Sequence, residues 1–353
     1  MSTGAREDRV EAHIEKRENG HRGAGVEKGR EATSPWRMPW KGWKEVLVRT
    51  AKETSADNVS LVAAGVSFYG FLALLPLLGA TVLAYGLLAE PETVLRNMAE
   101  MARIMPDDIA RLVGEQLMYV VRSSGEKKGL GVLIALALAL FSARNGAAAI
   151  VTALNIAYEE EEKRGFLKVN LLALTITAAA VAMTVVALLA VTVVARIEAL
   201  LPGSQPLLEF GTKALSHLLL LAVAATAAAA LYRYGPSREN ARWMWLSPGS
   251  LLFALCWVAL TLGFGTYVTT FGNYSATYGS LAAVVILLTW MYLSSYLLVF
   301  GAELNSELEH QTRRDTTEGA ASPMGTRGAW AADHVAQGTD TDAHDNPDAG
   351  QSQ

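Results

Sequence analysis

The chain has 353 residues, of which 51% are hydrophobic and only 18% charged, with a formal net charge of −4. Its apolar residues gather in six long runs, each long enough to cross a bilayer, which excludes most classes of soluble enzyme. The single cysteine, Cys256, excludes an intramolecular disulfide and a cysteine-based metal site. We therefore predict an all-α, polytopic membrane protein.

Both ends of the chain are hydrophilic. Residues 1–40 are rich in Arg, Glu and Gly, and residues 309–353 are rich in Thr, Asp, Gly and Gln. Segments of this kind bury too little apolar surface to fold, so we expect two disordered tails around one membrane domain at residues 41–308.

Residues 41–57 predict a basic amphipathic helix just before the first apolar run. An apolar stripe there is surrounded by Lys41, Lys44, Arg49 and Lys52. Two alternatives stay open. The helix lies in the headgroup layer, attracted by anionic lipid, or it packs against the ends of the membrane helices.

The predicted spans are 59–88, 130–157, 169–195, 213–234, 248–271 and 281–304. Lys and Arg gather before the first span and after the second, fourth and sixth, whereas loops 199–212 and 272–280 contain neither. Because basic loops stay in the cytoplasm, both termini are expected on the cytoplasmic side. The external loop 89–129 has two apolar stripes at helical spacing, which predict two amphipathic helices.

Arg144 is the most costly residue of the predicted spans. It lies near the middle of the second one, where a charge costs about 2.5–3.5 kcal/mol on insertion scales. Helical spacing puts Thr152 and Asn155 on the same face. Two alternatives stay open for this face. In the first, it binds an anionic group such as a lipid phosphate. In the second, Arg144 only braces the bundle by donating to backbone carbonyls that a kink at Pro76 exposes.

A polar stripe also follows the sixth span, where Tyr292, Tyr296 and Glu303 share one face. Ser67 adds a hydroxyl in the first span. We therefore predict a polar seam between spans one, two and six, with Tyr292 as the neighbour of Arg144. The alternative is that these groups only form hydrogen bonds between helices, each worth about 0.6 kcal/mol.

Glu303 lies at the cytoplasmic end of the sixth span, too far from Arg144 along the helix axis for an ion pair. We expect Glu303 to meet Arg233, Arg164 or the amides of a helix start.

Several short stretches together resemble the YihY/BrkB family of bacterial inner-membrane proteins. They are residues 63–69 with 75–77, 144–146 with 153–155 and 158, 273–274 with 277–280, and 290–292 with 301–305. The resemblance covers about residues 40–308. It implies six spans, both ends in the cytoplasm and a place in the plasma (inner) membrane. Some members carry the label ribonuclease BN, and others are tied to serum resistance or envelope integrity.

A ribonuclease does not fit the residues. A metal-dependent nuclease needs clustered ligands, and the six histidines form no cluster along the chain. No phosphate-binding glycine loop is present in the sequence either. We expect no enzymatic activity, no cofactor, no metal and no nucleic-acid partner.

Two functions fit the sequence. The first is a transporter or lipid-translocating protein that uses the polar seam. The second is a non-transporting envelope protein that holds partners through loop 89–129 and the tails. The expected partners are membrane lipids, with a further copy of the chain or another envelope protein as a protein partner.

Overall fold

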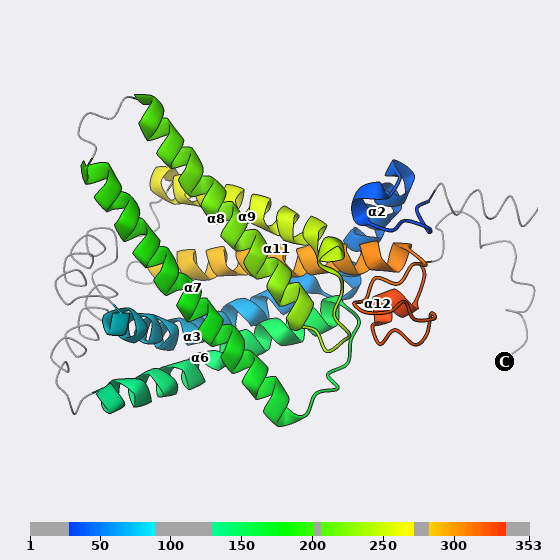
Figure 1. The fold of residues 1–353 in the computed structure, drawn as a ribbon, viewed down its shortest axis with the longest axis horizontal. Coiled ribbons are helices and arrows are strands. Elements are labelled where there is room, and N and C mark those ends of the chain that lie inside the picture. The colour runs from blue at the N-terminus through cyan, green and yellow to red at the C-terminus, as the bar shows by residue number, and fades with distance from the viewer. Residues whose placement is uncertain (1–27, 89–128, 201–205, 272–281, 337–353) are drawn as a thin grey trace, which may run out of the picture.

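A computed structural model describes residues 28–88, 129–200, 206–271 and 282–336 (Figure 1). Within these ranges the chain is helical, and an isolated antiparallel bridge between Ala241 and Thr317 is the only β-pairing. The all-α class is therefore confirmed. The two helices predicted for the first external loop lie outside the described residues.

Long helices occupy each of the predicted apolar runs. They are α3 (Val59–Leu88), α6 (Gly129–Ala157), α7 (Phe166–Leu200), α8 (Pro206–Tyr234), α9 (Trp243–Phe271) and α11 (Ala282–Gln311). Over the described residues, 4 helices are long and apolar enough to cross a membrane, or 5 if a bent helix pair counts as one span. The chain is thus a multi-pass membrane protein. The total of six spans and the cytoplasmic location of both termini stay predictions.

The bent pair consists of α2 (Trp40–Ala56) and the start of α3, which meet at an angle of 64°. Asn58 in the link has a left-handed backbone, with φ of 51°, which Asn tolerates better than most residues. The bend lays α2 against α11 with Val46 fully buried. Of the two alternatives for residues 41–57, packing on the bundle is therefore observed. Lys44 and Leu47 are exposed on the outward face of α2. Contact between this face and lipid stays a prediction.

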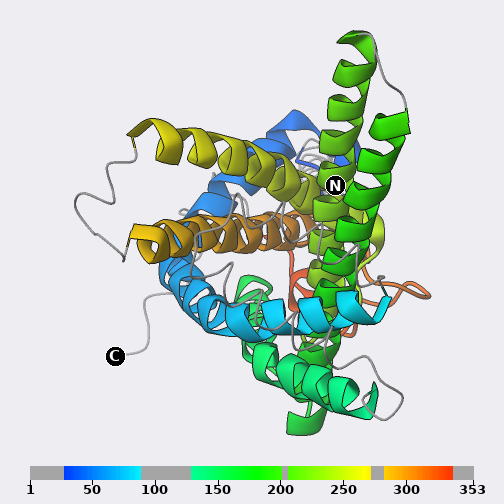
Figure 2. The same cartoon turned by 90° about the vertical axis from the view of Figure 1, so that its left-hand side faces the viewer.

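The helices come together at one end of the molecule. Helices α3, α6, α9 and α11 run toward the side where α2 and the short α12 (Trp330–Asp333) lie, and α7 and α8 cross them obliquely (Figures 1 and 2). We call this side the terminal end and define it as residues 28–58, 158–165, 235–242 and 303–336. Most of the described charged residues lie there.

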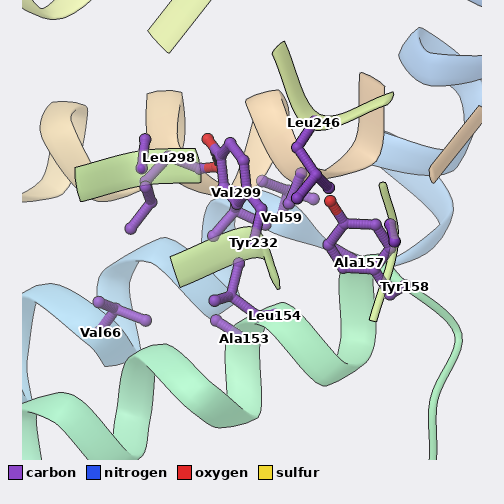
Figure 3. Close-up of a cluster of buried hydrophobic side chains, with 13 residues drawn as sticks. Val59, Val66, Ala153, Leu154, Ala157, Tyr158, Tyr232, Leu246, Leu298 and Val299 are labelled. Atoms are coloured by element: carbon purple, nitrogen blue, oxygen red, sulfur yellow. Dashed lines mark hydrogen bonds between the residues drawn. The ribbon is translucent and has the colours of Figure 1, made fainter. Parts of the chain in front are cut away.

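The apolar core borders the terminal end. Side chains from α3, α6, α8, α9 and α11 meet there (Figure 3). Leu154, Tyr158 and Tyr232 are among its fully buried members. The Tyr232 hydroxyl donates to the Leu298 carbonyl at 2.8 Å, so this phenol is satisfied inside the core.

Helices α9 and α11 touch through two glycines. A Cβ atom on Gly249 would lie 2.0 Å from the Gly301 carbonyl oxygen, and one on Gly301 would lie 2.4 Å from the Tyr232 hydroxyl. Only glycine leaves room for the two backbones here. Small residues at helix contacts permit this close approach in membrane proteins.

The tail boundaries differ from the sequence-based expectation. Residues 312–336 are folded against the terminal end, where the Arg313 amide donates to the Arg30 carbonyl at 2.8 Å and the Thr312 hydroxyl to the Ala32 carbonyl at 2.8 Å. Residues 28–40 take part in the same packing. Composition suggested disorder because it counts apolar surface, whereas hydrogen bonds and ion pairs hold this polar segment.

Candidate functional site

Arg144 contacts α7. Its Nη1 donates a hydrogen bond to Asn170 Oδ1, and its guanidinium carbon lies 4.6 Å from the centre of the Phe141 ring. Asn170 is held in place because its Nδ2 donates to the Phe166 carbonyl at 2.7 Å. The Nε atom of Arg144 is buried and has no hydrogen-bond partner among the described residues. Most of the donor capacity of this guanidinium is therefore not used by the protein.

The surroundings of Arg144 face outward from the bundle. Phe141 is 58% exposed, and Asn145 and Thr152 are exposed as well. The Thr152 hydroxyl donates to the Ala148 carbonyl of its own helix at 3.1 Å. Arg144 itself is half-buried. It thus lies at the junction of α6 and α7, beside a face that lipid would cover.

The other residues of the predicted seam lie apart from Arg144. The Tyr292 ring packs on Tyr296, with ring centres 6.5 Å apart, and Tyr296 stacks on Phe300. No hydrogen bond or ring contact joins Arg144 to Tyr292 in the described part of the chain. The structure brings Arg144 to Asn170 instead, a residue that the sequence analysis missed.

Ser67 and Pro76 both lie in α3. The Ser67 hydroxyl is buried and donates to the Ala64 carbonyl at 2.8 Å, so its own helix satisfies it. Helix α3 continues through Pro76 as one element. Within the described ranges, no hydrogen bond or ring contact joins either residue to Arg144.

Asn155 connects loops at the terminal end. Its Oδ1 accepts from the Ser237 amide at 2.8 Å, and its Nδ2 donates to Glu162 at 3.0 Å. Arg164 pairs with the same carboxylate at 2.7 Å, and this hydrogen bond is the main cause that lowers the pKa of Glu162 to about 2. Asn155 therefore joins the α6–α7 loop to the α8–α9 loop, away from Arg144.

The two arginines that were expected to meet Glu303 pair with other acids. Arg233 pairs with Glu318, and Arg164 pairs with Glu162. The carboxyl group of Glu303 instead lies beside that of Asp57. The reason is the bend between α2 and α3, which brings the linking residues onto α11 and cannot be seen in loop charges.

Asp57 is also part of a group of acids that includes Glu53 and Glu159. One carboxylate oxygen from each of the three lies within 4.8 Å of the others. Burial, and then the charges of neighbouring acids, raise the pKa of Glu159 above its ordinary value. Asp57 and Glu159 line a cavity of about 790 Å³ at the terminal end. These residues form a second candidate site.

Buried ion pairs fix the rest of the terminal end. Arg238 pairs with Glu309 at 2.7 Å, and both side chains have no exposed surface. Arg49, which the sequence analysis counted among surface charges, pairs with Glu307 at 2.5 Å. The latter bond joins α2 to α11. Charge patterning alone does not distinguish such a buried base from an exposed one.

The chain is similar to known proteins over most of its membrane region. A ribonuclease-like protein of Bacillus subtilis (strain 168), YfkH, is 32% identical over 182 residues, which are 50% of this chain and 64% of that protein. The chain thus matches somewhat less than two thirds of that relative's length. No solved structure matches. The family model described as virulence factor BrkB matches residues 50–324, and the chain therefore belongs to this family.

Proposed function

We propose that this membrane protein binds anionic amphiphiles such as phospholipids and moves them across the bacterial plasma membrane. Arg144 would receive the phosphate of the headgroup. The observation that carries the proposal is the half-buried guanidinium beside an outward face, with Asn170 as its only hydrogen-bond partner among the described residues.

An unneutralised charge is costly within a bilayer. A neutral amide and the face of the Phe141 ring compensate a guanidinium only in part, since an arginine at mid-bilayer costs about 2.5–3.5 kcal/mol or more. A phosphate supplies both the missing negative charge and paired oxygen acceptors, which match the planar donor geometry of arginine. Binding at this junction would therefore be favoured for lipids that carry a phosphate.

The test is lipid movement in proteoliposomes that contain the purified full chain. Loss of a fluorescent phospholipid signal to an external quencher reports transfer between leaflets. We expect Arg144→Ala to lower the rate at least about tenfold, the effect of about 1.4 kcal/mol, and Arg144→Lys to lower it partly because the ammonium cannot bind in a bidentate manner. Lys168→Gln, which removes an exposed positive charge from the first turn of α7, is the matched control.

A second function is favoured by the folded terminal end. Residues 312–336 are held by bonds such as that between Thr316 and Glu309 at 2.7 Å, and they form a folded polar surface on which a protein partner could dock. A non-transporting scaffold would show no lipid transfer above protein-free vesicles. In that case Arg144→Ala would change only the melting temperature of the protein.

We also propose that the protein has no nuclease activity. The acidic cavity at the terminal end carries Asp57, Glu159, Glu160 and Asp333. Such a surface repels the phosphates of RNA, whereas nucleic-acid sites are basic. Incubation of the purified chain with labelled RNA, with and without divalent cations, is expected to leave the RNA intact.

A further inference from the structure

We propose that the terminal end binds a divalent cation, of the hard class of Ca²⁺, Mg²⁺ and Mn²⁺, through Glu53, Asp57, Glu159 and Glu303. The site lies where the link between α2 and α3 meets the ends of α6 and α11. It is independent of Arg144 and of the proposed lipid transfer.

The geometry of three of the ligands suits such an ion. One oxygen from each of Glu53, Asp57 and Glu159 lies within 4.8 Å of the others. Oxygens bound to one Ca²⁺ lie about 2.3–2.6 Å from the ion, so two of them are at most about 5 Å apart. A set made only of carboxylates favours hard cations over Zn²⁺ or copper, which prefer nitrogen and sulfur.

Glu303, which comes from a different helix, is the proposed fourth ligand. This residue of α11 is only 2% exposed, and its Oε1 has no hydrogen-bond partner among the described residues. Its carboxyl group lies beside that of Asp57. Two carboxylates approach each other in this way only when a proton or a cation lies between them.

The local charge balance requires compensation. Neighbouring bases are paired with other acids. Arg49 and His310 lie 2.5 and 3.7 Å from Glu307, and Lys163, which lines the same cavity, lies 3.3 Å from Glu160. The structure records no ion pair for any of the four proposed ligands within the described ranges. Several unpaired carboxyl groups near one point repel one another, and a divalent cation removes that repulsion.

The cation also has a route to the site and a structural consequence. Asp57 and Glu159 line the cavity of about 790 Å³, large enough for a hydrated ion. Glu53 comes from α2, Asp57 from the link, Glu159 from the turn after α6 and Glu303 from α11. Binding would therefore clamp the 64° bend of α2 against two membrane helices.

The experiment measures Mn²⁺ binding to the full chain in a neutral detergent, by electron paramagnetic resonance of the free ion, with Ca²⁺ and Mg²⁺ as competitors. Asp57→Asn, Glu159→Gln and Glu303→Gln each remove one ligand charge while they keep the side-chain shape. Glu161→Gln is the matched control, because Glu161 lines the same cavity and lies outside the cluster. Site variants are needed because the C-terminal segment also carries Asp340, Asp342 and Asp345.

We expect each ligand variant to weaken Mn²⁺ binding by at least about tenfold, and Glu161→Gln to bind like the wild type. The melting temperature separates binding from folding. Without cation the ligand variants should melt at or above the wild-type temperature, because repulsion is relieved, and only the wild type and the control should gain stability from Ca²⁺. The proposal is overturned if binding is the same in all variants, or if lower pH stabilises the wild type while no cation does.

Discussion

The buried pair of Arg238 and Glu309 allows a sharp test of what holds the terminal end together. Neither side chain has exposed surface, and two hydrogen bonds of 2.7 and 3.3 Å join them. The guanidinium carbon also lies 4.1 Å from the centre of the Tyr158 ring. Arg238→Met removes these interactions and leaves the carboxylate of Glu309 buried, with the Thr316 hydroxyl as its only remaining side-chain donor among the described residues.

The expected loss follows from this geometry. Removal of one partner of a buried ion pair costs about 3–5 kcal/mol, mostly because the remaining charge is uncompensated. Replacement of both partners by apolar residues of similar volume is often neutral. The double variant Arg238→Met with Glu309→Met should therefore be more stable than either single variant.

The free energy of unfolding can be measured by titration with sodium dodecyl sulfate in mixed micelles, followed by tryptophan fluorescence. Protease cleavage within residues 312–336 reports whether this segment detaches first. The reasoning is refuted if Arg238→Met costs less than about 1 kcal/mol, as exposed pairs do, or if the double variant is as unstable as the sum of the single ones.

Three further predictions concern stability. Gly301→Ala should destabilise the protein by about 1–3 kcal/mol in the same titration, because the new Cβ would lie 2.4 Å from the Tyr232 hydroxyl; no change would contradict the close helix contact. Tyr232→Phe should cost about 1–3 kcal/mol, since the Leu298 carbonyl loses its buried phenol donor; the reading fails if the variant is as stable as the wild type. Arg164 lowers the pKa of Glu162 in the folded protein to about 2. The stabilisation that this pair provides is therefore fully present above the unfolded pKa of about 4.3, and it is lost as the pH falls toward about 2. Glu162→Gln should flatten this part of the pH–stability curve, and an unchanged curve would argue against the pair.

The sequence predicted the helices better than the contacts between them. Each predicted apolar run coincides with a long helix to within one residue at its start or is contained in it, because the length and hydropathy of a span are local properties of the chain. Arg144 could also be singled out, since a charge within an apolar run is costly wherever the helix packs. Its partner Asn170 could not, because their contact depends on how α6 and α7 cross.

The sequence-based reading of the polar end was less complete. Arg49 looked like one of several surface bases, yet it is buried against Glu307. The polar segment 312–336 looked disordered, because composition measures apolar burial and says nothing of specific hydrogen bonds. The acidic group of Glu53, Asp57 and Glu159 could not be predicted from the sequence, since Glu159 follows α6 and is about 100 positions away from the end of α2.

By itself, the sequence determined that this is an all-α membrane protein and where its apolar helices lie, because residues close together in the chain decide helix length and burial in lipid. The tertiary structure decided which charges meet. Arg49 and Glu307 are 258 positions apart, and Arg238 and Glu309 are 71 apart. Such pairs form only after the bend at Asp57 and the packing of the helices have brought distant segments together, so no local pattern encodes them.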